Sequence, residues 1–188
     1  MATSNSILIR HADAPADAGA CAEIYAPFVR GSAVSFEQQA PGAAELTGRI
    51  ERISRTHPWL VAVDGGAVAG FAYAATHRER AAYCWAADVT VYVHAGHRRR
   101  GIGQALYRAL LELLVRQGLY VACAGITLPN DASVALHESL GFQPVGVYRR
   151  IGFKAGAWRD VGWWQLALAA PGDGEPTEPG PPARLERA

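Results

Sequence analysis

The stretch over residues 91–114, VYVHAGHRRRGIGQALYRALLELL, constrains the fold most, because a basic, glycine-containing turn joins a strand pattern to a helix pattern. Val91 and Val93 alternate with their neighbours as in a strand, and leucines then recur at helical spacing. The start of such a helix offers free backbone N–H groups and the positive end of its dipole to an anion. Gly101 and Gly103 have no Cβ, so a phosphate can approach these amides closely. The pattern predicts a site for a diphosphate.

The basic turn has two other interpretations. It could merely cap the helix, or it could belong to a surface that binds nucleic acid. It is not a P-loop, because no GxxxxGK[ST] pattern is present. Aromatic residues are not interleaved with its arginines, and the net charge of the chain is only +1, so no global field favours a polyanion. We therefore expect no nucleic-acid partner, while the capping interpretation stays open at this point.

Composition indicates one globular domain that does not cross a membrane. The chain has 188 residues, of which 50% are hydrophobic, and this is enough for a substantial core. No apolar run approaches the roughly 20 residues that span a bilayer, and the N-terminal MATSNSILIRH lacks the apolar segment of a signal peptide. We expect a cytoplasmic protein with no membrane partner. Cys21, Cys84 and Cys123 are widely spaced, so we expect reduced thiols and neither a disulfide framework nor a zinc site.

Hydrophobic periodicity divides the chain into strands and helices. Strand patterns cover residues 6–10, 59–63, 68–75, 85–94, 120–128, 142–150 and 161–169. Helix patterns cover residues 16–30, 43–56, 100–117 and 132–140. The sequence from residue 171 onward, PGDGEPTEPGPPARLERA, is rich in proline, glycine and charge, which predicts a disordered tail over residues 171–188. We expect one α+β domain with a mixed sheet over residues 1–170.

Several motifs follow one another in a definite order. After a strand that ends TVYV come RxxGxG and a long helix, and after a strand that ends ITLPN come Ser133, His137 and LGF. This order resembles the GNAT superfamily of acyl-CoA N-acetyltransferases, and most closely its phosphinothricin (methionine sulfone/sulfoximine) acetyltransferase family. The segments that carry the resemblance are SFE (35–37), HPWLVAV (57–63), AGFAYA (69–74), RERAAYCWAADVTVYV (78–93), LPNDASVALHESLGF (128–142) and GFKAGAWRDVGWWQ (152–165).

The resemblance implies the GNAT fold, in which a central mixed sheet flanked by helices splays open near its middle. It also implies that acetyl-CoA is the cosubstrate, with its pantetheine in the gap and its diphosphate on the amides of residues 98–103. An open strand edge can pair with such a ligand through its main chain. The residues implied to bind the cofactor are Val91, Tyr92, Val93, Arg98, Arg99, Arg100, Gly101, Ile102, Gly103, Gln104, Asn130 and Ser133. No metal is implied.

Two residues are candidates for proton transfer. Family members carry a glutamate base on the TVYV strand, where this chain has Asp88, which is one methylene shorter and is expected to act through an ordered water. The alternative is that Asp88 only pairs with an arginine such as Arg80. His137 stands where this family carries a histidine, and it could protonate the thiolate or help to accept the amine proton. The alternative is a hydrogen-bonded structural histidine.

The resemblance also implies a substrate site and a homodimer. Five residues match positions that line the substrate pocket in the family, namely Phe36, Arg78, Arg80, Tyr83 and Lys154. Arginine suits bidentate recognition of a carboxylate or phosphinate, so the expected substrate is a small amino acid of the phosphinothricin or methionine sulfone type. Two alternatives stay open: a GNAT enzyme for another amine, such as a polyamine, an aminoglycoside or a protein N-terminus, and an acyl-CoA-binding module without turnover.

Overall fold

The computed structural model describes residues 7–170, 172 and 174–185. The strands are β1 (Leu8–His11), β2 (Trp59–Asp64), β3 (Ala67–Thr76), β4 (Ala86–Val93), β5 (Val121–Leu128), β6 (Gln143–Lys154) and β7 (Ala157–Ala167). The main helices are α1 (Ala14–Arg30), α2 (Ala43–Ile53), α3 (Ile102–Gln117) and α4 (Asp131–Ser139). Each strand and helix expected from periodicity is present, although Ser6, the first residue of the strand expected at 6–10, lies outside the described residues.

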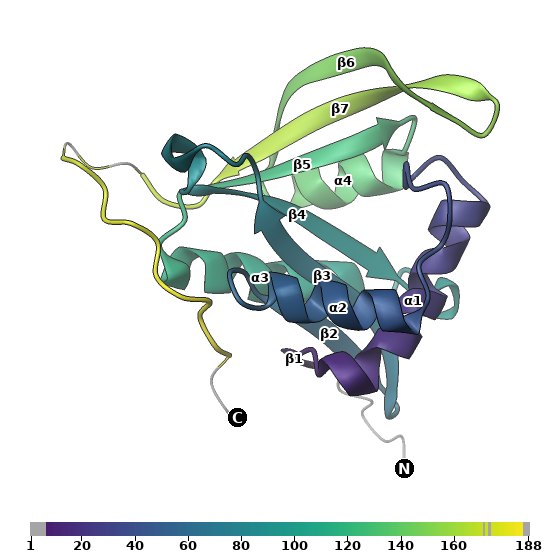
Figure 1. Cartoon of the computed structure of the whole chain (residues 1–188). Coiled ribbons are helices and arrows are strands. Elements are labelled where there is room, and N and C mark those ends of the chain that lie inside the picture. Colours follow the sequence, from purple (N-terminus) through teal and green to yellow (C-terminus); the bar gives the residue numbers. More distant parts are fainter. Residues whose placement is uncertain (1–6, 171, 173, 186–188) are drawn as a thin grey trace.

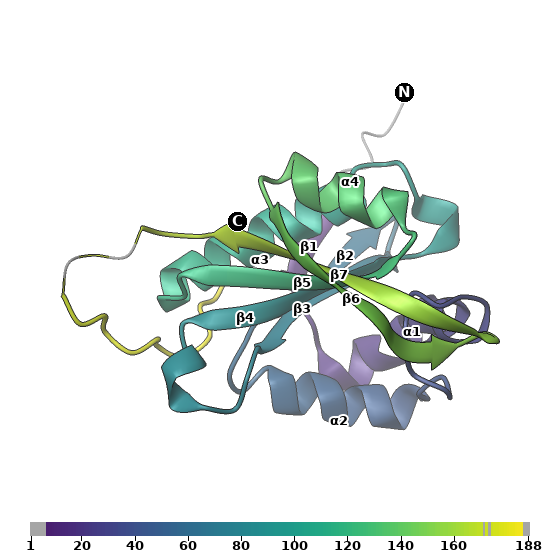
Figure 2. The same ribbon diagram turned by 90° about the horizontal axis from the view of Figure 1, so that it is seen from above.

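All seven strands form one sheet in the order β1-β2-β3-β4-β5-β7-β6 (Figure 1). Neighbouring strands are antiparallel except β4 and β5, which run parallel. Helices α1 and α2 lie on one face of the sheet, and α3 and α4 lie on the other (Figure 2). A mixed sheet between two helical layers confirms the predicted α+β class.

Packing against the sheet fixes the position of α3. Leu106, Leu110, Leu113 and Leu114 are all 0% exposed in the larger of two hydrophobic clusters. Burying a leucine side chain stabilises a fold by roughly 1.5–3 kcal/mol, so this row of leucines fixes which side of α3 meets the sheet. Because only a short loop separates β4 from α3, the same packing holds the N-terminus of α3 beside the end of β4.

The hairpin of β6 and β7 is longer than the sequence predicted. The two strands continue to a tight turn at Ala155 and Gly156, both with positive φ, whereas periodicity ended the first strand at residue 150 and began the second at 161. Apolar side chains on this extension are exposed, for instance Ile151 at 56% and Trp158 at 62%. These side chains pack against no core in this chain. The alternation of apolar inward and polar outward residues, by which a strand is predicted from sequence, is therefore missing here.

The described residues of the tail form no helix or strand, but they lie against the domain. The N–H of Gly180 donates to the carbonyl of Gln117 at 2.8 Å, and the indole N–H of Trp85 donates to the carbonyl of Thr177 at 2.9 Å. Leu185 packs against the larger hydrophobic cluster. These contacts give the segment 174–185 a defined place, while the division into a domain and a disordered tail stays a prediction; residues 171, 173 and 186–188 lie outside the described part.

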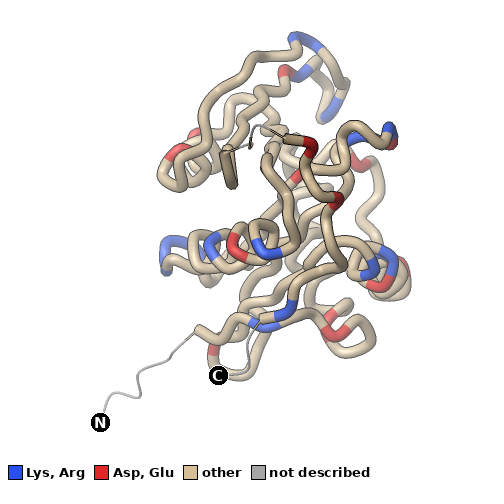
Figure 3. The backbone as a smooth tube through the Cα atoms, turned by 90° about the vertical axis from the view of Figure 1, so that its left-hand side faces the viewer, with Lys and Arg blue, Asp and Glu red and all other residues tan. Residues whose placement is uncertain are grey.

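Charged residues of both signs are interspersed over the surface (Figure 3). On α2, for example, the Arg49 guanidinium pairs with the carboxylates of Glu37 and Glu45. Within the part of the chain that the structure describes, no helix is both long and apolar enough to cross a membrane.

Candidate active site

Strands β4 and β5 pair over only three residues each and then separate. The pairs join residues 86–88 to residues 121–123, although each strand is eight residues long. Beyond Asp88 the two strands splay apart (Figure 1). A cavity of about 90 Å³ lies in this fork and is lined by residues that include Val91, Tyr92, Asn130 and Ser133. The fork therefore gives a ligand access to a strand edge in the middle of the sheet, among four of the residues predicted to bind the cofactor.

The turn between β4 and α3 is open on the side where an anion could approach. Gly101 is the N-cap of α3, with φ 77° in the left-handed region, where a side chain is strained. A Cβ built on Gly101 meets no heavy atom within 4 Å, whereas one on Gly103 would lie 3.3 Å from Cδ2 of Leu136. The space next to Gly101 is therefore open, whereas Gly103 has no room for a side chain because it packs against α4, and the first amides of α3, those of Ile102, Gly103 and Gln104, lie at a helix end that favours an anion.

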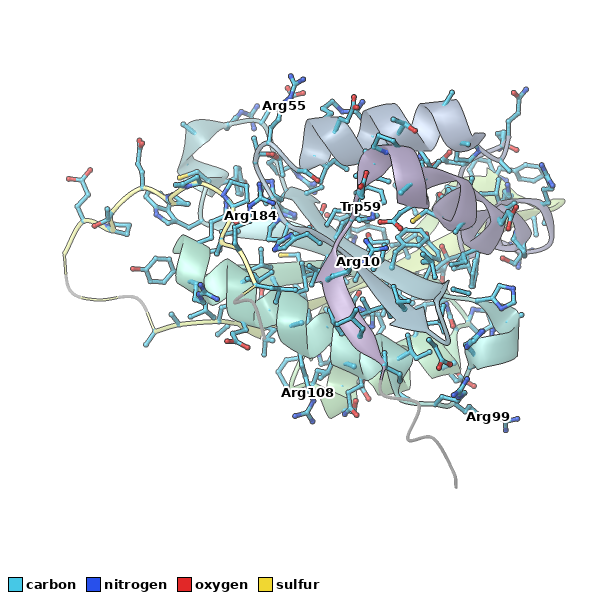
Figure 4. All side chains as sticks on the ribbon, turned by 90° about the horizontal axis from the view of Figure 1, so that it is seen from below. Arg10, Arg55, Trp59, Arg99, Arg108 and Arg184 are labelled. Atoms are coloured by element: carbon cyan, nitrogen blue, oxygen red, sulfur yellow. The ribbon has the colours of Figure 1, made fainter. Side chains whose placement is uncertain are left out.

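The three arginine side chains of this turn point in different directions. Arg100 donates to the carboxylate of Asp64, and the guanidinium of Arg98 lies 5.6 Å from the ring centroid of Phe28. Arg99 is exposed and projects from the molecule (Figure 4). Ile102 is 1% exposed, so only its main chain is available to a ligand. Two of the three guanidinium groups are thus occupied by protein groups, which leaves the main chain as the better candidate for holding a diphosphate.

Asp88 lies at the point where the fork opens, and its partner is a histidine. His77 Nδ1 lies 2.7 Å from Oδ1 of Asp88. Burial raises the pKa of the Asp88 carboxyl, and the hydrogen bond and charge of His77 and the charge of Arg78 act in the opposite direction. The partner of Asp88 is therefore His77. The alternative partner expected from the sequence was an arginine such as Arg80. The role of Asp88 as base stays a prediction.

Cys123 completes a group of three potential ligands at this point. His77, Asp88 and Cys123 each offer one ligand atom, and these atoms lie within 4.8 Å of one another. However, 2.7 Å between nitrogen and oxygen is a hydrogen-bond distance, shorter than the separation of two ligands on one zinc ion. Burial also raises the pKa of the Cys123 thiol to about 11. We therefore interpret the group as a hydrogen-bonded His–Asp pair beside a protonated thiol.

His137 is buried, and both of its ring nitrogens have partners. Nδ1 lies 2.7 Å from the carbonyl oxygen of Ser133, which can only accept, so Nδ1 carries the proton. Nε2 lies 3.0 Å from the hydroxyl of Tyr107 and accepts from it when the imidazole is neutral. Burial lowers the pKa of His137, and the bond to Ser133 opposes this only in part. His137 and Tyr107 both line the fork, but the imidazole is neutral there, and its catalytic role stays a prediction.

The residues predicted to bind the substrate fall into two groups. Arg78 and Arg80 line one open cavity of about 550 Å³ together with His77, and the ring of exposed Tyr83 lies 5.9 Å from that of His77. Phe36 and Lys154 do not line this cavity.

The second group, Phe36 and Lys154, lies near the turn at the tip of the β6–β7 hairpin. Lys154 is buried and donates to the carbonyl of Glu37, and the ring of Phe36 covers Gly152 so closely that a Cβ there would lie 2.2 Å from it. In this chain, Phe36 and Lys154 therefore hold the 35–37 loop against the hairpin. The structure does not place them with Arg78 and Arg80.

Sequence reasoning missed three residues of the site. His77 follows directly after a predicted strand, and Tyr107 lies within the predicted helix, but neither position stands out in the sequence. Trp163 lies within the motif GFKAGAWRDVGWWQ, which assigns no role to this particular tryptophan. Its ring lies 6.0 Å from that of His77 and 5.9 Å from the guanidinium of Arg78, and its buried indole N–H has no hydrogen-bond acceptor among the described residues. An unpaired buried donor is costly, so a hydrogen-bond acceptor at this N–H would stabilise the protein.

Comparison with known proteins decides the family. Residues 22–142 match the Acetyltransferase (GNAT) family. The chain belongs to this family. It is 42% identical over 164 residues to a phosphinothricin N-acetyltransferase of Streptomyces viridochromogenes, covering 87% of this chain and 90% of that protein. It is 34% identical to an L-methionine sulfoximine/L-methionine sulfone acetyltransferase of Salmonella typhimurium, covering 85% of this chain and 94% of that protein.

Solved structures agree with this assignment. A GNAT superfamily phosphinothricin acetyltransferase from Sinorhizobium meliloti in complex with acetyl-CoA has a TM-score of 0.86 at 34% identity, covering 92% of this chain and 94% of that one. An acetyltransferase from Salmonella typhimurium with its cofactor acetyl-CoA has a TM-score of 0.85 at 31% identity, covering 90% and 98%. The GNAT fold and the family resemblance predicted from the motifs are confirmed.

Proposed function

We propose that this GNAT enzyme transfers the acetyl group of acetyl-CoA to the amino group of a small amino acid with a tetrahedral acidic or sulfone-like group. Phosphinothricin, methionine sulfoximine and methionine sulfone are examples of this class. The observation that carries the proposal is the fork between β4 and β5, with Asp88 where the strands part and the glycine turn of α3 beyond the end of β4. Relatives named for these substrates support it.

The coenzyme would lie along the fork. Its pantetheine amides would pair with the open main-chain edge of β4 near Val91 and Val93, as a strand added to a sheet edge would. Its diphosphate would rest on the amides of the turn that starts at Arg98 and runs into α3. Asn130 would lie beside it, with its side chain accepting from the N–H of Ser133 at the start of α4.

Proton transfer is the main chemical task of the protein. The amine must lose a proton before it attacks the thioester carbonyl, and the departing thiolate must gain one. Asp88 would take the amine proton, directly or through an ordered water. The thioester is already activated, so no nucleophilic side chain is needed, and holding the two reactants together supplies much of the acceleration. For the same reason we propose that no metal ion takes part.

The acidic end of the substrate would lie near Arg78 and Trp163. The guanidinium of Arg78 is exposed, and it donates to the carbonyl of its neighbour His77 at 2.9 Å, which leaves further N–H groups for an anionic ligand. The unpaired indole N–H of Trp163 could donate to an oxygen of a phosphinate or sulfone. Two donors close to the His77–Asp88 pair favour an acidic amino acid over a polycationic amine.

We also propose a cytoplasmic homodimer. Large apolar side chains on the β6–β7 hairpin are exposed, namely Val145, Val147, Tyr148, Ile151, Phe153 and Trp158. Several exposed large apolar side chains on one hairpin are typical of an interaction site. A second copy of the chain would cover it.

A thiol-release assay tests the proposed function. The purified enzyme is given acetyl-CoA and, in separate reactions, phosphinothricin, methionine sulfoximine, methionine sulfone, a polyamine, an aminoglycoside and a peptide with a free N-terminus. We expect the three small amino acids to give the highest kcat/KM. A preference for a polyamine or for the peptide would contradict the proposed substrate class, and no thiol release with any amine would favour a binding module.

A further inference from the structure

The partner of Asp88 is a histidine that the sheet places next to it. The sheet register places Ala75 opposite Asp88 and Thr76 opposite Ala87, so the chain leaves β3 beside the base. His77 is the first residue after β3, and its side chain is 16% exposed against 33% for Asp88. The antiparallel register of β3 and β4 thus places the imidazole next to the carboxylate. Both side chains are partly shielded from water.

The imidazole is held in place from two sides. Its ring makes edge contacts with Tyr83 at 5.9 Å and with Trp163 at 6.0 Å, from different elements of the fold. A ring that is restrained on both sides has few alternative orientations, so its hydrogen bond to Asp88 is directional. The bond also involves a charged acceptor, and such bonds are among the stronger ones in proteins.

We propose that His77 is a positioning residue for Asp88, donating its Nδ1–H to Oδ1 so that Oδ2 is left to receive the amine proton. The proposal rests on the proposed function, in which Asp88 is the base. A base needs a fixed direction, and among the described residues His77 is the one hydrogen-bond partner of the short Asp88 side chain. The proton balance is simple, because the amine loses one proton and Oδ2 gains it, while the Nδ1 proton stays on His77.

The same hydrogen bond counteracts the effect of burial. Desolvation raises the pKa of Asp88, which would leave the carboxyl protonated and inactive over a wider pH range, and the bond from His77 is the leading influence in the opposite direction. The other charged or titratable groups near the pair, among the described residues, are Arg78, Tyr73, Tyr83 and Cys123. Of these, Arg78 also lowers the pKa of Asp88, through its charge. His77 therefore acts on both the direction and the ionisation of the base.

The test compares His77→Leu with His77→Asn in the full-length protein. Asparagine keeps a side-chain N–H donor close to the position of Nδ1, whereas leucine keeps bulk and removes the donor. With acetyl-CoA and methionine sulfone, we expect His77→Leu to lower kcat/KM at neutral pH by about 10- to 100-fold, the range for a hydrogen bond to a charged group. Asp88 must be ionised to act, so the acidic limb of the pH profile should move to higher pH. His77→Asn should stay within several-fold of wild type, with its limb near the wild-type position.

Two results would overturn the proposal. A wild-type rate and pH profile for His77→Leu would show that Asp88 needs no positioning. A His77→Asn variant as slow as His77→Leu would show that the imidazole itself takes the proton. If no amine of the panel is acetylated by the wild type, the proposed function fails, and a carboxyl-carbon NMR titration of Asp88 still decides this inference: the pKa of Asp88 must be higher in His77→Leu than in wild type and His77→Asn.

Discussion

The left-handed glycine at the start of α3 gives the most direct test of coenzyme binding. Gly101 has φ 77° at the N-cap of α3, and Gly118 has φ 93° at its C-cap. A side chain in the left-handed region costs roughly 1–2 kcal/mol. For a chain of this size each kcal/mol lowers Tm by about 2–4 °C, so Gly101→Glu and Gly118→Glu should both lower Tm by about 2–8 °C. The two substitutions add the same side chain at positions of similar backbone strain, and because a negative charge is unfavourable at a helix C-terminus, Gly118→Glu should be the less stable variant of the two.

Only one of the two variants should lose acetyl-CoA. At Gly101 the new carboxylate would stand where we place the diphosphate, and two unit charges 4 Å apart repel by roughly 4 kcal/mol at an effective dielectric constant of 20. That corresponds to about a thousandfold increase in Kd. Calorimetry with acetyl-CoA should therefore show binding at wild-type affinity for Gly118→Glu and almost none for Gly101→Glu. Equal Kd values for Gly101→Glu and wild type would refute the diphosphate site, and equal losses in both variants would show that binding fails through instability.

Two further predictions concern the hairpin and the tail. Trp158 is 62% exposed, so Trp158→Asp should convert a homodimer into a monomer in sedimentation experiments at micromolar concentration, and a wild type that is already monomeric would contradict the proposed dimer. Removal of residues 171–188 should lower Tm by about 4–8 °C, because the bond from Gly180 to Gln117 and the packing of Leu185 together stabilise the fold by about 2 kcal/mol; an unchanged Tm would instead support the disordered tail predicted from the sequence.

The fold could be predicted well because its signals are local. Leucines at helical spacing predicted α3, and the apolar runs at 59–63 and 68–75 predicted two strands, which the structure contains as the antiparallel pair β2 and β3. The order of the motifs then predicted the GNAT fold, and both the family match and the solved structures confirm it. Periodicity failed only for the outer half of β6 and β7, whose apolar side chains have no core to face in this chain.

The site was predicted less completely because its contacts are not local. The sequence singles out Asp88 as an acidic residue on a strand, but only the register between β3 and β4 shows that His77 is its partner. The same holds for Trp163, whose unpaired N–H becomes visible once β7 lies beside β5. Conversely, resemblance grouped Lys154 with the substrate residues, and the structure shows it bonded to the carbonyl of Glu37.

The role of His137 can be tested through the pH dependence of stability. Burial lowers its pKa in the folded state, while an unfolded chain has the ordinary value of about 6.5. Between these two values the unfolded state binds more protons, so stability falls as pH drops below about 6.5, by up to roughly 1.4 kcal/mol per pH unit from this group. In His137→Asn this contribution disappears, and the decline in stability between neutral and mildly acidic pH should become shallower, although His11 and His57, whose pKa values burial also lowers, still contribute.

Activity measurements on the same variant separate a structural His137 from a catalytic one. A general acid that protonates the thiolate contributes about 10²–10⁴-fold to the rate, and its loss would also remove the alkaline limb of the kcat profile. Nδ1 of His137 donates to the carbonyl of Ser133, and because burial lowers the pKa of the imidazole, Nε2 is expected to accept from Tyr107, which leaves His137 no further proton to give. We therefore expect His137→Asn to retain kcat within about tenfold and to keep the alkaline limb, while its Tm falls. A loss of a hundredfold or more together with the alkaline limb, at unchanged acetyl-CoA affinity, would instead identify His137 as the acid and would mean that its hydrogen bonds rearrange when the coenzyme binds.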